Sequence, residues 1–155
     1  MNALFQKLNF KNQPAIHVLN APGSFHPAME EMRGFTEVRT SMTRAKNAEF
    51  ALAFAIKQSE VDKFAGQVAK SSAGDAIVWV AYPKGTSKKY KCEFNRDTGW
   101  AKFGAEGFEP VRMVAIDEDW SALRFRRVEH IKTMKRSFAI TEAGRKKAAA
   151  SAKAK

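Results

Sequence analysis

The stretch that decides the fold is Ala76-Ile77-Val78-Trp79-Val80-Ala81-Tyr82, which leads without a break into Pro83-Lys84-Gly85-Thr86-Ser87-Lys88-Lys89. An uninterrupted apolar run of this length is typical of a strand that is buried on both faces of a parallel sheet. The basic, glycine-containing segment after it is typical of a loop at the carboxyl end of such a strand. The stretch therefore predicts an α/β sheet and the edge of that sheet at which a site would lie.

A second apolar run, at residues 50–56, forms a strand–helix–strand unit with the first. Between the two runs, Val61, Phe64 and Val68 recur at helical spacing, and we expect Ser59 to cap this helix. A crossover of about twenty residues favours parallel pairing and a right-handed βαβ unit.

Toward the amino terminus, residues 16–19 predict a short strand, residues 27–33 a short helix and residues 36–40 a short edge strand. The connection from this edge strand to residues 50–56 is too short for a helical crossover. Either the connection is extended, or the strand at 36–40 lies outside the sheet.

Toward the carboxyl terminus, residues 111–116 and 123–128 predict an antiparallel hairpin, with a turn at Asp117-Glu118-Asp119. We expect Arg124 and Arg126 on the face opposite to its inward set, which is Val114, Ile116, Leu123 and Phe125. A short helix or turn is expected within residues 95–106, and a last helix at residues 131–138.

These elements predict a single three-layer, Rossmann-like α/β domain over residues 1–142, with a mostly parallel sheet and a C-terminal antiparallel hairpin. Residues 143–155 form a basic tail rich in Ala and Lys, expected to be disordered or a frayed helix. The sequence contains no apolar run of membrane-spanning length, no continuous apolar leader and only one cysteine. We therefore expect a cytoplasmic protein that has no membrane partner.

The net charge of +11 arises from 27 basic and 16 acidic residues. The tail contains no acidic residue and five basic ones, Arg145, Lys146, Lys147, Lys153 and Lys155. Such a tail predicts weak, salt-sensitive attraction to polyanions such as nucleic acid. The alternative is that it is a solvated, solubilising terminus.

Three separated motifs occur in order: Tyr82-Pro83-Lys84, Asn95-Arg96-Asp97, and residues 114–124 with the sequence VAIDEDWSALR. Together they resemble an uncharacterised bacterial family of small α/β domains of unknown function. The resemblance covers residues 14–127 and implies a fold without an activity.

The order of residues 50–56, a helix, residues 74–80 and a closing hairpin also resembles the second half of a class I S-adenosylmethionine-dependent methyltransferase. This resemblance implies a Rossmann-like scaffold with a cofactor site. The sequence departs from that family at its glycine-rich turn, which is replaced by Asn20-Ala21-Pro22-Gly23-Ser24. It departs again where the family has a ribose-binding acid, because Ser41 and Met42 stand there. We therefore expect no cofactor, with S-adenosylmethionine as the disfavoured alternative.

The loop at residues 84–89 combines a glycine, two hydroxyls and three ammonium groups, which are the ingredients of an anion site. Its spacing does not fit a P-loop. With a methyltransferase-like strand order, the topological switch lies between residues 16–19 and 50–56, so the loops that follow these strands would flank a crevice. The candidate ligand-binding residues are therefore Asn20, Pro22, Ser24, Lys57, Tyr82, Lys84, Thr86, Ser87 and Lys88. The alternative is an ordinary polar surface loop.

Other reactive side chains give weaker patterns. Asp117, Glu118 and Asp119 are adjacent and point in different directions, so we expect a hairpin turn there and no metal site. Cys92 has cations nearby in sequence that could lower its pKa, but no histidine is spaced to activate it. The catalytic residues of any reaction therefore stay unassigned.

Three functions remain open at this point. The first is a non-catalytic cytoplasmic α/β module that binds a small anionic ligand at the carboxyl edge of the strands. The second is a methyltransferase-derived enzyme that acts on a small molecule. The third is a protein that associates with nucleic acid without sequence preference through its basic tail.

Overall fold

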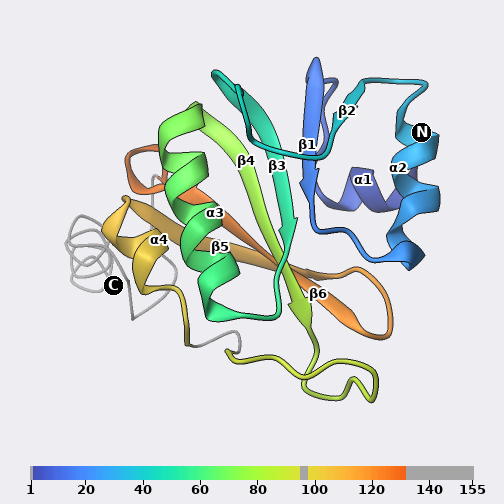
Figure 1. The fold of residues 1–155 in the computed structure, drawn as a ribbon. Coiled ribbons are helices and arrows are strands. Elements are labelled where there is room, and N and C mark those ends of the chain that lie inside the picture. Colours follow the sequence, from blue (N-terminus) through green and yellow to red (C-terminus); the bar gives the residue numbers. More distant parts are fainter. Residues whose placement is uncertain (1, 95–97, 132–155) are drawn as a thin grey trace, which may run out of the picture.

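A computed structural model describes residues 2–94 and 98–131 of the chain. Its centre is a six-stranded sheet in the order β2-β1-β3-β4-β6-β5 (Figure 1). The strands are β1 (Ala15–Leu19), β2 (Glu37–Arg39), β3 (Ala48–Phe54), β4 (Ser72–Pro83), β5 (Phe108–Ala115) and β6 (Trp120–Arg127). The first four strands are parallel, whereas β6 runs antiparallel to both β4 and β5. This confirms the predicted mostly parallel sheet with a C-terminal hairpin.

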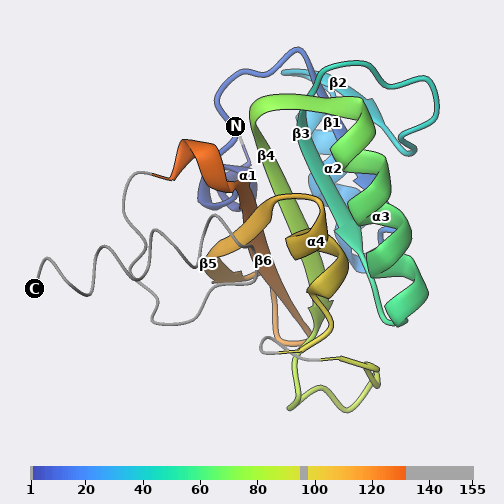
Figure 2. The same cartoon turned by 90° about the vertical axis from the view of Figure 1, so that its left-hand side faces the viewer.

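Helices cover both faces of the sheet and give the three expected layers (Figure 1 and Figure 2). One face, here called the α3 face, packs against α3 (Gln58–Ser71) and α4 (Ala101–Ala105). The other, the α1 face, packs against α1 (Ala3–Lys7) and α2 (His26–Met32). Two 3-10 turns, η1 (Gly23–Phe25) and η2 (Val128–His130), complete the described elements. The motif at residues 95–97 and most of the helix expected at 131–138 lie outside the described residues, as does the tail at 143–155.

The βαβ unit built from β3, α3 and β4 was predicted correctly, because both of its strands are buried on both faces. On β3, Phe50 and Leu52 point to the α1 face, while Ala51 and Ala53 point to the α3 face. The small alanine side chains let α3 approach the sheet closely, and the larger ones fill the layer below α1 and α2.

Strand β2 belongs to the sheet and pairs in parallel with β1. The connection from β2 to β3 contains no helix and includes a turn at residues 43–44, so β2 belongs to the sheet without a helical crossover. Met42 and Ala45 of this connection are buried in the cluster of the α3 face. The connection therefore supplies apolar cover that a crossover helix would otherwise provide.

The predicted cap of α3 is wrong by two residues. The helix begins at Gln58 with Lys57 as the N-cap residue, and Ser59 lies inside the first turn. The carboxylate of Glu60 reaches back and accepts hydrogen bonds from the backbone N–H of Ile56 and of Lys57, each at 2.9 Å, and the N–H of Gln58 donates to the carboxylate of Glu93 at 2.6 Å. Two acids thus stabilise the start of α3, where a serine hydroxyl was expected.

The predicted inward set of the hairpin is also wrong, because it combines two faces. Leu123 and Phe125 pack on the α3 face, whereas Val114 packs on the α1 face. The register pairs Val114 with Ala122, which places Arg124 and Arg126 on the α1 face as well. Since both faces of β6 are covered, apolar alternation along the hairpin cannot identify a single inward side.

No helix within residues 2–94 and 98–131 combines the length and the apolar character that crossing a lipid bilayer requires.

Candidate functional site

Residues 84–94, here called the anchored loop, connect the carboxyl end of β4 to the region of α4 and are fixed at three points. The backbone N–H of Lys84 donates to the carbonyl of Asp119 in the hairpin turn at 2.8 Å. The hydroxyl of Ser87 donates to the carboxylate of Asp119 at 2.9 Å. At the far end, the N–H of Glu93 donates to the carbonyl of Ile56, just before α3, at 3.0 Å. The loop therefore spans the carboxyl edge of the sheet as a bridge.

The Ser87 hydroxyl organises this bridge from within. Besides donating to Asp119, its oxygen accepts hydrogen bonds from the backbone N–H of Lys89 and of Tyr90, each at 3.2 Å. These three bonds use the hydroxyl as donor and as acceptor. Ser87, predicted as a ligand contact, thus has a structural role in the loop.

Replacing Ser87 with alanine is expected to destabilise the protein by about 1–3 kcal/mol, because the Asp119 carboxylate and two loop amides lose their partner. Urea unfolding followed by tryptophan fluorescence measures this change. Ser59→Ala is the matched control, since Ser59 is exposed on α3 and makes no side-chain hydrogen bond in the described part of the chain. Equal stabilities of the two variants would contradict the role assigned to Ser87.

A cavity of about 880 Å³, here called the loop cavity, lies under the anchored loop. Its walls are the end of β4 (Tyr82 and Pro83), residues 84–87 and 90–94 of the loop, Thr98, and Met113 and Ser121 of the hairpin. Tyr82 and Phe94 supply aromatic surface, and their ring centroids are 6.0 Å apart. The size and the mixed lining are those of a site for a small molecule.

The charges around the loop cavity favour an anion. Lys84 and Lys91 line it, and within the described residues neither forms an ion pair. Among the described residues of the lining, the one acid is Glu93, whose carboxylate accepts a hydrogen bond from the backbone N–H of Gln58 at 2.6 Å. Because this N–H lies at the positive end of α3, the helix offsets the Glu93 charge. Two ammonium groups therefore determine the potential inside the cavity.

Cys92 also lines the loop cavity, but its thiol is not activated. Burial raises the pKa of Cys92, and the nearby carboxylate of Glu93 raises it further. The expectation that neighbouring cations lower this pKa is therefore wrong, because desolvation has the larger effect. At neutral pH the sulfur carries its proton and is a poor nucleophile.

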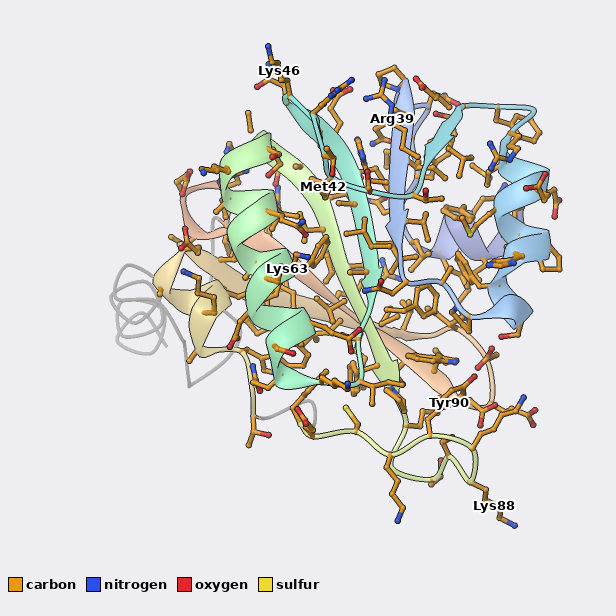
Figure 3. All side chains as sticks on the ribbon, viewed as in Figure 1. Arg39, Met42, Lys46, Lys63, Lys88 and Tyr90 are labelled. Carbon is orange, nitrogen blue, oxygen red and sulfur yellow. The ribbon has the colours of Figure 1, made fainter. Side chains whose placement is uncertain are left out.

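The structure divides the sequence-predicted site residues into two groups. Tyr82, Lys84, Thr86 and Ser87 line the loop cavity, and Lys88 lines an adjacent hollow of about 520 Å³ together with Thr86. Asn20, Pro22, Ser24 and Lys57 line neither of these spaces. Figure 3 shows Lys88 extending from the loop, away from the sheet.

The second group lies near the switch between β1 and β3, where direct contacts bridge the strand ends. The side-chain amide of Asn20 donates to the carbonyl of Phe54, the last residue of β3, at 3.4 Å. The Phe25 ring, in the segment after β1, lies 4.9 Å from the Phe54 ring. The row continues through the Trp120 ring, 5.1 Å from that of Phe54, to the Tyr90 ring of the anchored loop, 4.9 Å from that of Trp120. Aromatic rings thus occupy the edge where the predicted crevice would open.

The end of β2 is the position at which the methyltransferase family has a ribose-binding acid, and Ser41 lies just beyond it in this chain. Strand β2 ends at Arg39, which pairs with Glu37 at 3.1 Å, and Thr40 and Ser41 follow.

Near the hairpin turn, the carboxylate of Asp117 accepts hydrogen bonds from the N–H groups of Asp119 and Trp120 at 2.8 and 2.9 Å. This turn uses its acids locally. In the part of the chain that the structure describes, no three His, Cys, Asp or Glu side chains converge as metal ligands.

Sequence reasoning missed several walls of the loop cavity. Tyr90, Lys91 and Phe94 continue the loop that carries Lys84, so the length of that loop was the available signal. Met113 and Ser121 gave no local signal. They reach the cavity because β6 lies beside β4 with β5 outside it, a strand order that only the tertiary structure shows.

Comparison with known proteins places the chain by its fold. No family model and no curated protein sequence matches it. Its structure is similar to that of a SAM-dependent methyltransferase from Aquifex aeolicus, with a TM-score of 0.56 at 8% identity over 80% of this chain and 87% of that one. It is also similar to the pyocyanin biosynthetic protein PhzM, with a TM-score of 0.52 at 14% identity over 79% and 52% of the two chains. For the fibrillarin pre-rRNA processing protein of Methanococcus jannaschii the TM-score is 0.50 at 9% identity, over 76% and 67%.

At these identities the similarity is one of fold, and it confirms the methyltransferase-like Rossmann resemblance. The sheet and its closing hairpin define the class: a small α/β protein with a methyltransferase-like Rossmann fold.

Proposed function

We propose that this protein is a non-catalytic cytoplasmic module that binds a small anionic ligand in the loop cavity. The observation that carries the proposal is the pair of ammonium groups, Lys84 and Lys91, in a cavity where the one carboxylate among the described residues is held at a helix end. A phosphate or carboxylate group placed between the two lysines would form charge-assisted hydrogen bonds. The aromatic walls would accommodate the rest of the ligand.

The chemistry of the lining favours binding over catalysis. Its one thiol, Cys92, is protonated at neutral pH because its pKa is raised, and the hydroxyl of Ser87 is engaged with a carboxylate and two amides. The ammonium groups of Lys84 and Lys91 and the rings of Tyr82 and Phe94 bind and orient a ligand.

Cys92 provides the test, since it is the only cysteine in the chain and lies in the cavity wall. Inorganic pyrophosphate is expected to slow its alkylation by iodoacetamide at pH 8, in proportion to occupancy of the site. Lys84→Gln should raise the pyrophosphate concentration that gives half-maximal protection about tenfold, because one charged hydrogen bond is lost. Lys46→Gln is the control, since it removes the same charge at the opposite end of the sheet (Figure 3).

Protection that is equal in both variants would show that the lysine charge acts at a distance or not at all, and the proposal would fail.

Calorimetry with S-adenosylmethionine tests the second candidate function, a methyltransferase-derived enzyme, which the structural neighbours favour. We expect weak binding, because ring contacts bridge the β1–β3 switch and no acid follows β2. Micromolar affinity would replace the proposed module with that enzyme.

A further inference from the structure

A group of arginines lies on the α1 face of the hairpin, and neither the loop cavity nor the tail accounts for it. Arg124 of β6 is the cross-strand partner of Trp79 on β4, whose side chain belongs to the cluster of that face. On its other side, Arg124 is paired with Arg112 of the edge strand β5. The cavity walls contributed by the hairpin, Met113 and Ser121, alternate with these arginines and point to the α3 face.

The pairing of Arg112 with Arg124 is electrostatically unfavourable. Side chains directly opposite each other on neighbouring antiparallel strands lie about 5 Å apart at Cβ, and like charges at such positions destabilise a sheet. Arg124 is half-buried, and its buried Nε–H has no acceptor among residues 2–94 and 98–131. Burial lowers the pKa of Arg124, and the charges of Arg126 and Arg112 lower it further. The guanidinium nevertheless keeps its charge at neutral pH.

The chain itself does not neutralise this pair within the described residues. Arg126 donates two hydrogen bonds to the carboxylate of Asp75, at 2.7 and 2.6 Å, so this nearby acid is paired with Arg126. Neither Arg112 nor Arg124 forms an ion pair there. By sequence, residues 95–97 and 132–155, outside the described part, contain two acidic residues, Asp97 and Glu142, and nine basic ones. A balancing anion would therefore come from another molecule.

We propose that Arg112 and Arg124 form a binding site for a phosphate group on the α1 face of the hairpin, separate from the loop cavity. Two guanidinium groups side by side offer planar, forked donors that match phosphate oxygens. The phosphate would belong either to a nucleic-acid backbone or to a free polyphosphate. Both sources present the same chemistry to the arginines.

The test uses the full chain and measures anisotropy of a labelled 12-nucleotide single-stranded DNA at fixed ionic strength. Arg112→Gln is expected to lower affinity about tenfold and to reduce the salt slope by about one. Arg124→Lys keeps the charge but loses the fork, and should also weaken binding. Lys63→Gln, on α3 across the sheet (Figure 3), is the charge-matched control and should change affinity less than twofold.

Inorganic pyrophosphate distinguishes the two sources: competition at concentrations comparable to the oligonucleotide indicates a free polyphosphate site, and weak competition indicates a nucleic-acid backbone site. Both results support the proposal.

Thermal unfolding gives a second readout, in which Arg112→Gln should raise the melting temperature of the free protein by relieving repulsion. Equal losses in Arg112→Gln and Lys63→Gln, or a lower melting temperature for Arg112→Gln, would overturn the site. Lys84→Gln should leave oligonucleotide affinity unchanged, so failure of the loop cavity and failure of this site give different results.

Discussion

Phe54→Ala is expected to destabilise the protein by about 3–5 kcal/mol. The Phe54 side chain is 2% exposed, and its ring contacts the rings of Phe25 and Trp120. Removing it deletes buried apolar area and leaves a void at the point where the ends of β1, β3 and β6 meet. Equilibrium unfolding in urea measures the difference, with the slope against denaturant compared between variants.

Phe35→Ala is the matched control for this prediction, because the same atoms are removed from a side chain that is 55% exposed. It should change stability by no more than about 0.5 kcal/mol. If Phe54→Ala matched this control, the aromatic row across the carboxyl edge would not contribute to the stability of the fold.

Gly99→Ala is expected to cost about 2–4 kcal/mol, from backbone strain together with a steric clash. Gly99 has a φ of +92°, and an added Cβ would lie 2.6 Å from the Cβ of Phe94 and 2.8 Å from the Gln58 side chain. The Gln58 amide also donates to the Gly99 carbonyl at 2.8 Å, which ties this position to the start of α3. Because Phe94 forms part of the cavity wall, the variant should also weaken pyrophosphate protection of Cys92.

Gly66→Ala is the control for Gly99→Ala. Gly66 lies inside α3 with open space at its Cβ position, so alanine there should stabilise the helix by about 0.5–1 kcal/mol. Thermal and urea unfolding of both variants measure the contrast. A Gly99→Ala protein as stable as the wild type would show that the backbone at this position relaxes without cost.

The βαβ unit was predictable from sequence because its strands are apolar on both faces and its helix repeats with a clear period. The hairpin was only partly predictable. Its strands were found, but Leu123 and Val114 were assigned to one face although they lie on two. Sequence alternation reports which residues share a side, and it cannot report that both sides are covered. The cap of α3 was predicted wrongly for a similar reason: Ser59 gave the stronger local signal, although Glu60 is the residue that accepts the hydrogen bonds there.

The candidate site shows the same limit. Lys84 and Tyr82 could be placed at the carboxyl end of a strand because a buried run ends beside them. The proposed partner residues after β1 were assigned by analogy with a switch-point crevice. What sequence could not show is that the Phe25 and Phe54 rings meet there, while the open space lies farther along, beside β6. Ring packing between distant segments leaves no periodic trace in the chain.

The three attachments of the anchored loop have a consequence for the kinetics and the energy of ligand capture. A loop fixed to Asp119 at one end and to Ile56 at the other has already lost the conformational freedom that binding would otherwise remove. A ligand that enters the cavity would then pay little ordering entropy, so a small number of polar contacts suffices for useful affinity. Association would resemble entry into a rigid receptor, with rates governed by diffusion and by the field of the lysines.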